Sequence, residues 1–368
     1  MGGEQNLRLP DPYTCWLAGI AGLSGPKKIA LTNEHSPQEI YMMPEIVLRQ
    51  LCEYLQIRQE TLLSARKQNP DQICLSLQKQ EISLVTWKDA DYPRKLRWIT
   101  DVPYALYYKG SLVPDCAAVS VVGARKCSEY GRQTAFALGR SLAQNGIPVI
   151  SGMAFGIDSE GHSGALKGGG KTWAVLGCGV DICYPSRSRR LYEQIPASGG
   201  GILSEFPPGT PPLPVNFPIR NRIISGLGDI TVVVEAKLRS GSLITADFAM
   251  EQGKEVMAVP GRICDPWSAG TNHLISQGAG ILTDVGQFLK DHNLCRENGR
   301  QEPDSQLSVL SGRENLMYRH LDYEPKYLDV LVDETGLNVR EALEVLGVLK
   351  KADLVKETFK NYFCRTFQ

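Results

Sequence analysis

The sequence lacks the patterns that mark membrane and secreted proteins. Across its 368 residues no apolar run reaches the roughly 18 residues that a membrane helix needs. The first residues do not show the basic-then-apolar order of a secretion signal. We therefore expect a cytoplasmic protein with no membrane association. The composition, 42% hydrophobic and 22% charged, is that of a folded chain with two or three domains.

Cysteine and histidine are not spaced for metal or redox chemistry. None of the ten cysteines forms a C-x-x-C pair, and the five histidines show no H-E-x-x-H spacing. No G-x-G-x-x-G or G-x-x-x-x-G-K-[ST] motif lies at a strand-to-helix turn, which argues against dinucleotide and P-loop sites. We therefore expect reduced, mostly buried thiols, no metal, no cofactor and no catalytic residue.

The charge balance excludes a protein that is basic over its whole surface. Forty Lys and Arg residues are matched by forty Asp and Glu residues. A polyanion would have to bind at a local cluster of basic residues, since the net charge offers no general attraction.

The middle of the chain alternates short Val- and Ile-rich runs with helical stretches. The runs at 117–123, 147–151, 172–177, 201–205, 230–235, 255–260 and 279–283 predict strands. Helices are expected at 132–145, 158–167, 187–194, 217–227, 242–252 and 271–277. Near-continuous apolar strands that alternate with helices predict an α/β fold, a doubly wound, extended Rossmann-like sheet that is mainly parallel.

The ends of the chain differ from this middle part. Residues 1–75 are mostly helical and suggest a sterile-alpha-motif or helix-hairpin-helix domain, in which Lys27 and Lys28 mark either a DNA-backbone hairpin or a plain exposed turn. Residues 76–116 read as a piece that leads into the sheet, so the central domain is placed at 76–292. A polar linker follows at 293–309, and the helix, helix and β-ribbon pattern of 310–368 predicts a winged-helix domain.

The candidate binding residues lie in the loops that follow the predicted strands. In a doubly wound sheet, ligands bind beyond the carboxyl ends of the strands, where helix N-termini present free N–H groups. Arginine recurs in these loops beside small residues, and this suits an extended phosphate chain better than one compact phosphate group. The candidates for binding such a phosphate chain and its exposed bases are Gly123, Arg125, Ser128, Phe155, Gly179, Tyr184, Arg187, Arg189, Arg190, Phe217, Arg220, Asn221, Arg222, Arg239, Ser240 and Ser242.

Several of these residues have a structural explanation that competes with the functional one. The three arginines at 187, 189 and 190 could form only a solvated helix face. The rings of Phe155 and Phe217 could stack on bases or belong to the core. Arg220 and Arg222 are two positions apart on a helix, so at most one of them is expected to face the ligand.

Asp158 and His162 lie one helical turn apart and share a face. We expect Asp158 to cap its helix, because it precedes an apolar-periodic stretch. We expect His162 to make a local hydrogen bond rather than to act in catalysis, because no Ser or Cys nucleophile is positioned with the pair.

Long runs of the central segment resemble the bacterial DNA-processing protein A family (DprA/Smf). The matching runs span about 117–285 and include VVGARKCSEYG, SGMAFGIDSEGHSGAL, AVLGCGVDICYPSRSRRLY, NFPIRNRIISGL and VVVEAKLRSGSLITADFAMEQGKEVMAVPG. The resemblance implies a dimeric protein that binds and protects single-stranded DNA and loads the RecA recombinase on it during natural transformation. It also implies DNA contacts at Arg125, at Arg187 and Arg189 after the Tyr-Pro, and at the run Arg220, Asn221 and Arg222.

Two features depart from the family pattern. Phe155 stands where many members carry a basic residue, which weakens one phosphate contact or replaces it with a stacking ring. Residues 286–368 hold 12 basic and 14 acidic residues. We therefore interpret the winged helix as a protein-contact or regulatory module. Exposed apolar helix residues, expected around 223–227 or 246–250, are candidates for the dimer interface.

Two other functions remain possible on the sequence alone. Phosphoribohydrolases of the lysine-decarboxylase-like kind share this architecture, but they carry P-G-G-x-G-T-x-x-E where this chain has RSGSLITADFAME. A transcription factor that uses the winged helix is disfavoured by the acidic balance of that segment.

Overall fold

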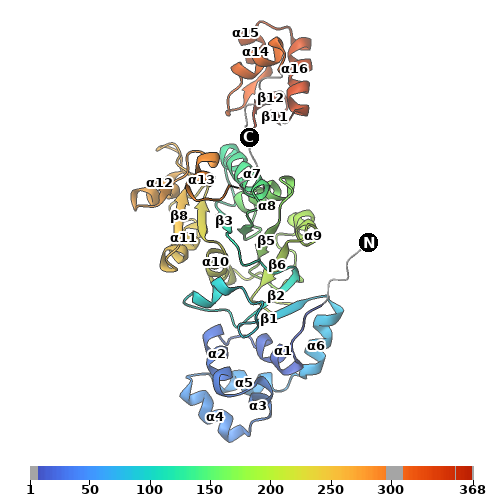
Figure 1. Ribbon diagram of the computed structural model, residues 1–368, viewed down its shortest axis with the longest axis vertical. Coiled ribbons are helices and arrows are strands. Elements are labelled where there is room, and N and C mark those ends of the chain that lie inside the picture. Colours follow the sequence, from blue (N-terminus) through green and yellow to red (C-terminus); the bar gives the residue numbers. More distant parts are fainter. Residues whose placement is uncertain (1–6, 296–309, 353, 367–368) are drawn as a thin grey trace.

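The computed structural model describes residues 7–295, 310–352 and 354–366 (Figure 1). At its centre is a nine-stranded sheet with the order β1-β2-β6-β5-β4-β3-β7-β8-β9. From β6 to β9 all neighbouring strands are parallel. These strands are β3 (Val119–Val122), β4 (Val149–Ser151), β5 (Thr172–Val175), β6 (Gly201–Ser204), β7 (Ile230–Val233), β8 (Glu255–Ala258) and β9 (Gly280–Ile281).

Two antiparallel strands extend one edge of the sheet. β2 (Ala105–Gly110) pairs with β6, and β1 (Ser83–Thr86) pairs with β2. The sequence predicted only a connecting piece here, so the part of the sheet contributed by 76–116 was missed. Strands of four and six residues among prolines and aromatic residues show no clear period, and their pairing depends on contacts distant in sequence.

Helices cover both faces of the sheet, which confirms the doubly wound α/β prediction. One face carries α7 (Glu129–Gln144), α8 (Ile157–Lys167), α9 (Arg189–Ala197) and α13 (Val285–Asp291). The other carries α10 (Asn216–Leu227), α11 (Gly241–Glu251) and α12 (Ala269–Ser276). Side chains alternate along β3 as the pleat requires. Val119 and Val121 pack with α7 and α8, while the Ser120 hydroxyl donates to the Ile224 carbonyl of α10 at 2.7 Å.

The helices α7 and α8 pack unusually closely, because glycines line their contact. A Cβ on Gly139 would lie 2.2 Å from the Gly161 carbonyl oxygen, and one on Gly164 would lie 2.0 Å from that of Phe136. Both separations are shorter than any real contact, so the crossing requires glycine at these positions. The close packing fixes α7, and with it the loop that precedes α7 at the carboxyl end of β3.

The N-terminal part is a set of helices that shares its core with the sheet. Trp16, Leu31 and Leu48 are fully or almost fully buried and belong to one apolar cluster with Tyr107 and Ala174 of the sheet. The helices are α1 (Pro12–Gly19), α2 (Gly25–Glu34), α3 (Pro37–Met42), α4 (Glu45–Tyr54), α5 (Gln59–Ala65) and α6 (Pro70–Lys79). They lie beside β1 in Figure 1, and the proposed boundary at residue 75 remains a prediction.

The turn between α1 and α2 does not offer its lysines to a ligand. The Lys27 ammonium donates to the Gln56 carbonyl, and Lys28, only 8% exposed, donates to the Ala18 carbonyl at 2.6 Å. The proposal that these lysines mark a DNA-backbone hairpin therefore finds no support, since both charges are used to hold the helices together. The alternative of a plain exposed turn fits Ala21, Gly22 and Ser24, which are exposed, but not Lys28, which is buried in α2.

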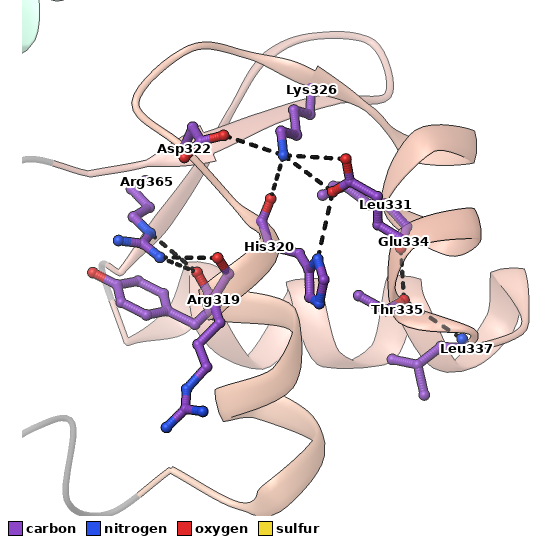
Figure 2. A network of polar contacts seen from close by, with 10 residues as sticks. Arg319, His320, Asp322, Lys326, Leu331, Glu334, Thr335, Leu337 and Arg365 are labelled. Carbon is purple, nitrogen blue, oxygen red and sulfur yellow. Dashed lines mark hydrogen bonds and ion pairs between the residues drawn. The ribbon is translucent and has the colours of Figure 1, made fainter.

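The C-terminal elements follow the order of a winged helix. They are α14 (Gly312–His320), β10 (Lys326–Tyr327), α15 (Leu328–Thr335), α16 (Val339–Lys351), β11 (Val355–Phe359) and β12 (Tyr362–Arg365), and β12 pairs with both other strands. Figure 2 shows how Lys326 joins them: its ammonium donates to the His320 carbonyl at 2.7 Å and pairs with Asp322 and Glu334. Residues 296–309 of the predicted linker lie outside the described residues.

Candidate nucleic-acid interface

The loops at the carboxyl ends of the parallel strands surround a pocket of about 500 Å³, which we call the loop pocket. Five cationic side chains line it, against one carboxylate, that of Asp158. The cations come from three places: the loop after β3, the loop after β7 and helix α10. They are Arg125, Lys126, Arg220, Lys237 and Arg239. Positive charge collected in a concave site attracts anions and raises their local concentration.

Arg125 is held at the mouth of the pocket by the loop between β3 and α7. The Ala124 amide donates to the Glu235 carbonyl at 2.8 Å, and the Glu235 carboxylate accepts bonds from both the amide and the hydroxyl of Ser128. The loop is therefore fastened at both ends to the end of β7. Ser128 caps α7, so that helix begins at Glu129 rather than at the predicted residue 132.

An aromatic wall lies beside the Arg125 guanidinium. The Arg125 Cζ atom lies 5.1 Å from the centroid of the Phe217 ring, and that ring lies 5.5 Å from the ring of Tyr184. Arg125 itself is exposed. A guanidinium placed over an aromatic face keeps its charge while its orientation is restricted, which suits a phosphate ligand.

The floor of the pocket holds a buried pair, Arg220 and Asp158. Arg220 donates to the carbonyls of Gly152 (3.0 Å) and Val175, and burial lowers its pKa to about 10. The Asp158 carboxylate accepts from the amides of Gly152 (3.2 Å) and Ala154 (3.3 Å). Burial raises the pKa of Asp158 to about 6, although Arg220 and these amides oppose the shift. The pair mainly shapes the loop at 152–154.

This arrangement corrects the expectation that Asp158 caps its helix. The N-cap of α8 is Gly156, and Asp158 is the second residue of the helix. Its carboxylate accepts hydrogen bonds from the loop that comes before the helix.

The start of α11 forms the opposite side of the pocket. Ser240 caps this helix through the Ser242 amide, and the two hydroxyl oxygens lie 2.8 Å apart. Lys237 and Arg239 precede the cap and are exposed. The Lys237 ammonium lies 4.0 Å from the centroid of the Trp267 ring, which also lines the pocket. The N-terminal end of a helix adds partial positive charge at this side.

Nine of the sixteen predicted residues line the pocket. They are Gly123, Arg125, Tyr184, Phe217, Arg220, Asn221, Arg239, Ser240 and Ser242. Lys126, Lys237 and Trp267 also line the pocket and were not among the predicted residues. Both lysines lie in loops that contain a predicted arginine, Arg125 or Arg239, whereas Trp267 lies in the loop after β8, in which no residue was predicted.

The other predicted residues lie outside the pocket lining. Phe155 is 43% exposed and follows Ala154 at the rim, so it is not a core residue. A Cβ on Gly179 would lie 2.3 Å from Asp181 Oδ1, which indicates a packing role. The group Arg187, Arg189 and Arg190 is exposed after Tyr184, and Arg189 pairs with Glu193 one turn along α9 at 2.6 Å.

Arg222 points away from the pocket into an internal ion-pair cluster. It is only 4% exposed and donates to both carboxylate oxygens of Glu205 at 2.8 and 2.9 Å. Its Nε lies 2.8 Å from the Asp101 carbonyl oxygen and 3.1 Å from the carboxylate of that residue. Of the two arginines on α10, Arg220 therefore lines the pocket, while Arg222 is held by internal acceptors.

His162 makes its hydrogen bond with Thr172 rather than with Asp158. It is fully buried, and its Nδ1 lies 2.6 Å from Thr172 Oγ1. Burial lowers the pKa of the imidazole to about 3, and the charge of Arg220 adds to the shift. In the unfolded chain the ring takes up a proton near its ordinary value of 6.5. Acid therefore favours unfolding as the pH falls from 6.5 toward 3.

We expect the buried His162 to lower the free energy of unfolding by about 2 kcal/mol as the pH falls from 7 to 5. Urea unfolding at both pH values should show that the stability of the His162→Asn variant falls less over this range than that of the wild type. The exposed His273, changed to Gln, serves as the control. Equal pH dependence in the wild type and the His162 variant would contradict the assignment of a buried, neutral ring.

Within the described ranges, no group of three or more His, Cys, Asp and Glu side chains is arranged to hold a metal ion. The same part of the chain contains no helix with the length and apolar character needed to cross a membrane.

Comparisons with known proteins give one family. The family model described as DNA recombination-mediator protein A matches residues 83–293. DNA processing protein DprA of Streptococcus pneumoniae is 39% identical over 270 residues, which cover 72% of this chain and 95% of that protein. Protein Smf of Escherichia coli is 37% identical over 344 residues, 91% of each chain.

Two solved structures are also similar. The X-ray structure of DNA processing protein A from Streptococcus pneumoniae aligns with a TM-score of 0.65 at 34% identity, covering 77% of this chain and 98% of that one. A structure of the Helicobacter pylori protein, described as revealing its single-stranded DNA binding mode, aligns with a TM-score of 0.52 at 29% identity. It covers 57% of this chain and 95% of that one. The Streptococcus pneumoniae and Helicobacter pylori proteins are named for DNA processing and not for nucleotide hydrolysis.

Proposed function

Because the chain belongs to the DNA recombination-mediator protein A family, we propose that its loop pocket binds the phosphate backbone of single-stranded DNA. The observation that carries this proposal is the charge of the pocket: five Lys and Arg side chains converge on it with one carboxylate. Such a site neutralises phosphates without reading sequence, so binding is expected to tolerate any sequence and to weaken as salt increases.

The aromatic side chains favour a single strand over a duplex. Phe217, Tyr184 and Trp267 border the cations, and Phe155 is exposed at the rim. Unpaired bases can stack on such rings, whereas the bases of a duplex are already stacked on one another. We propose that Arg187 and Arg190 extend the same cationic surface, since they follow Tyr184 closely in the chain.

The wider role follows the family. We propose that the protein protects single-stranded DNA, loads the RecA recombinase on it during transformation or recombination, and acts as a cytoplasmic homodimer. The similarity to proteins named for DNA processing supports this proposal.

The chemistry of the pocket supports binding rather than hydrolysis. A phosphoribohydrolase needs a carboxylate that can act as an acid or a base. Asp158 is the carboxylate that lines the described pocket, and its Oδ2 already accepts two backbone amides while Arg220 lies beside it. We therefore expect no release of free base when the protein is incubated with nucleoside monophosphates.

The proposal is tested by titrating salt in a binding assay with the full chain. Fluorescence anisotropy with labelled oligo-dT, and with a duplex of the same length, should show tighter binding of the single strand at every salt concentration. Tighter binding of the duplex, or affinity for one duplex sequence over random single strands, would contradict the proposal and favour a transcription factor.

A further inference from the structure

The winged-helix elements form a unit with a core of their own. Met317, Leu331, Leu346 and Phe363 are buried in one cluster, and every residue of that cluster lies between 310 and 363. The polar bonds of Lys326 in Figure 2 also remain within these elements. Because no apolar cluster joins this unit to the sheet in the described residues, its attachment there depends on polar contacts.

Two groups of polar contacts make that attachment. On α7, Glu129 pairs with Lys356. The buried Gln133 side chain, in the amide orientation that satisfies both of its ends, donates to the Arg365 carbonyl (3.1 Å) and accepts from Lys356 (3.3 Å). In the loop after β8, Arg262 pairs with Glu324, and both are more than 70% exposed. Figure 1 shows the unit beyond α7, at one end of the molecule.

Both attachment points adjoin loops that form the loop pocket. Glu129 is the first residue of α7 and lies three and four positions after Lys126 and Arg125. Arg262 shares its loop with Trp267 of the pocket wall. The side chain of Asn272 stabilises that loop, because it accepts a hydrogen bond from the Gly261 amide and donates one to the Gly261 carbonyl. Each attachment is therefore close in sequence to residues that line the pocket.

We propose that these contacts are an electrostatic latch, in which Arg262 and Lys356 are phosphate ligands held by Glu324 and Glu129 until a single strand displaces the carboxylates. The inference rests on the proposed function of the loop pocket. The exposed Arg262–Glu324 pair is weak and screened by salt, and the Lys356–Glu129 pair is still 35% and 34% exposed. Phosphates concentrated at the neighbouring pocket can therefore compete for both cations. The strand then gains two ligands, and the winged-helix unit is released.

The latch predicts a reciprocal effect on DNA affinity. If DNA opens the latch, removing the carboxylates that close it must strengthen DNA binding. We expect the full chain with Glu129→Gln and Glu324→Gln to bind oligo-dT about fivefold more tightly than the wild type. Glu344→Gln is the matched control, because it removes a carboxylate of the same unit that pairs with Arg340 on its own helix.

Changing the cations instead of the carboxylates separates two effects: release of the winged-helix unit and binding of phosphate by Arg262 and Lys356. Arg262→Gln with Lys356→Gln also opens the latch but removes the two phosphate ligands, so no gain in affinity is expected. An equal gain from both double variants would overturn the assignment of these cations as ligands. Unchanged affinity in the carboxylate variant, with the wild type binding normally, would overturn the latch.

A direct readout comes from carbodiimide cross-linking of the wild-type chain followed by mass spectrometry. The Lys356–Glu129 pair should form an amide cross-link whose yield falls as oligo-dT saturates the protein. The Lys350–Glu357 pair, 2.8 Å apart within the unit, is the internal control and should keep its yield. A constant Lys356–Glu129 yield at full saturation would overturn the proposal. Absence of oligo-dT binding in the parallel anisotropy assay would instead refute the proposed function.

Discussion

Reversing the charge of Arg125 is expected to weaken binding of single-stranded DNA by about tenfold or more at fixed salt. In the proposed binding mode, the Arg125→Glu variant would lose a phosphate contact at the loop pocket and would place a negative charge beside the DNA backbone. Anisotropy with oligo-dT measures the loss. Since the side chain is exposed and packs only over the Phe217 ring, the thermal unfolding curve should hardly change.

Arg94→Glu is the matched control for this prediction. Arg94 is an exposed arginine that pairs with Asp115 at 3.3 Å and does not line the loop pocket. The same change of charge there should leave DNA affinity within a factor of about two, because exposed charges more than a Debye length apart are largely screened. Equal losses in the two variants would show that the effect is one of overall charge and not of the pocket.

Arg222→Met is expected to reduce the free energy of unfolding by about 3–5 kcal/mol. The change leaves the Glu205 carboxylate without the guanidinium that now donates two hydrogen bonds to it. Burial already raises the pKa of Glu205, and Arg222 is the main group that opposes this shift. Chemical denaturation of the variant and the wild type at pH 7 provides the measurement.

A second variant tests the cause of the instability. Adding Glu205→Gln to Arg222→Met removes the unpaired charge and should recover part of the lost stability, because a neutral amide costs less to bury than a carboxylate. A stable Arg222→Met protein with reduced DNA affinity would contradict this account and place Arg222 in the DNA interface.

Much of the fold could be predicted from the sequence because each parallel strand is a short, nearly continuous apolar run. Val119, Val121 and Val122 are buried on both sides of the sheet, and no polar alternation was needed to find them. The antiparallel strands β1 and β2 could not be found in this way. Their sequences contain Ser, Thr, Tyr and Lys, and they become strands only through pairing with β6 and with each other.

Those residues of the candidate site whose positions depend only on where a strand ends could be predicted from the sequence. Arg125 and Arg239 lie in the loops that follow buried strands, so the topology brings them to the same edge of the sheet. The direction of a helical side chain is harder to predict. The spacing of Arg220 and Arg222 shows that they diverge, but only the three-dimensional packing shows that Glu205 and Asp101 lie on the side of Arg222.

The difference between Lys126 and Lys28 also shows that the surroundings of a side chain could not be predicted from the local sequence. Both follow a turn that contains glycine, yet Lys126 is exposed at the pocket while Lys28 is buried against the Ala18 carbonyl, where burial lowers its pKa to about 8. Local sequence cannot separate these outcomes, because they depend on whether another element covers the turn.

The most direct test of the central claim is the salt dependence of oligo-dT binding by a variant in which Arg125, Lys126 and Arg239 are all changed to Gln. Each phosphate contact that is lost should reduce the slope of log Kobs against log salt by about 0.7, so the variant should show a slope shallower by about 2. Parallel lines for the variant and the wild type would contradict the claim that these side chains bind the DNA backbone.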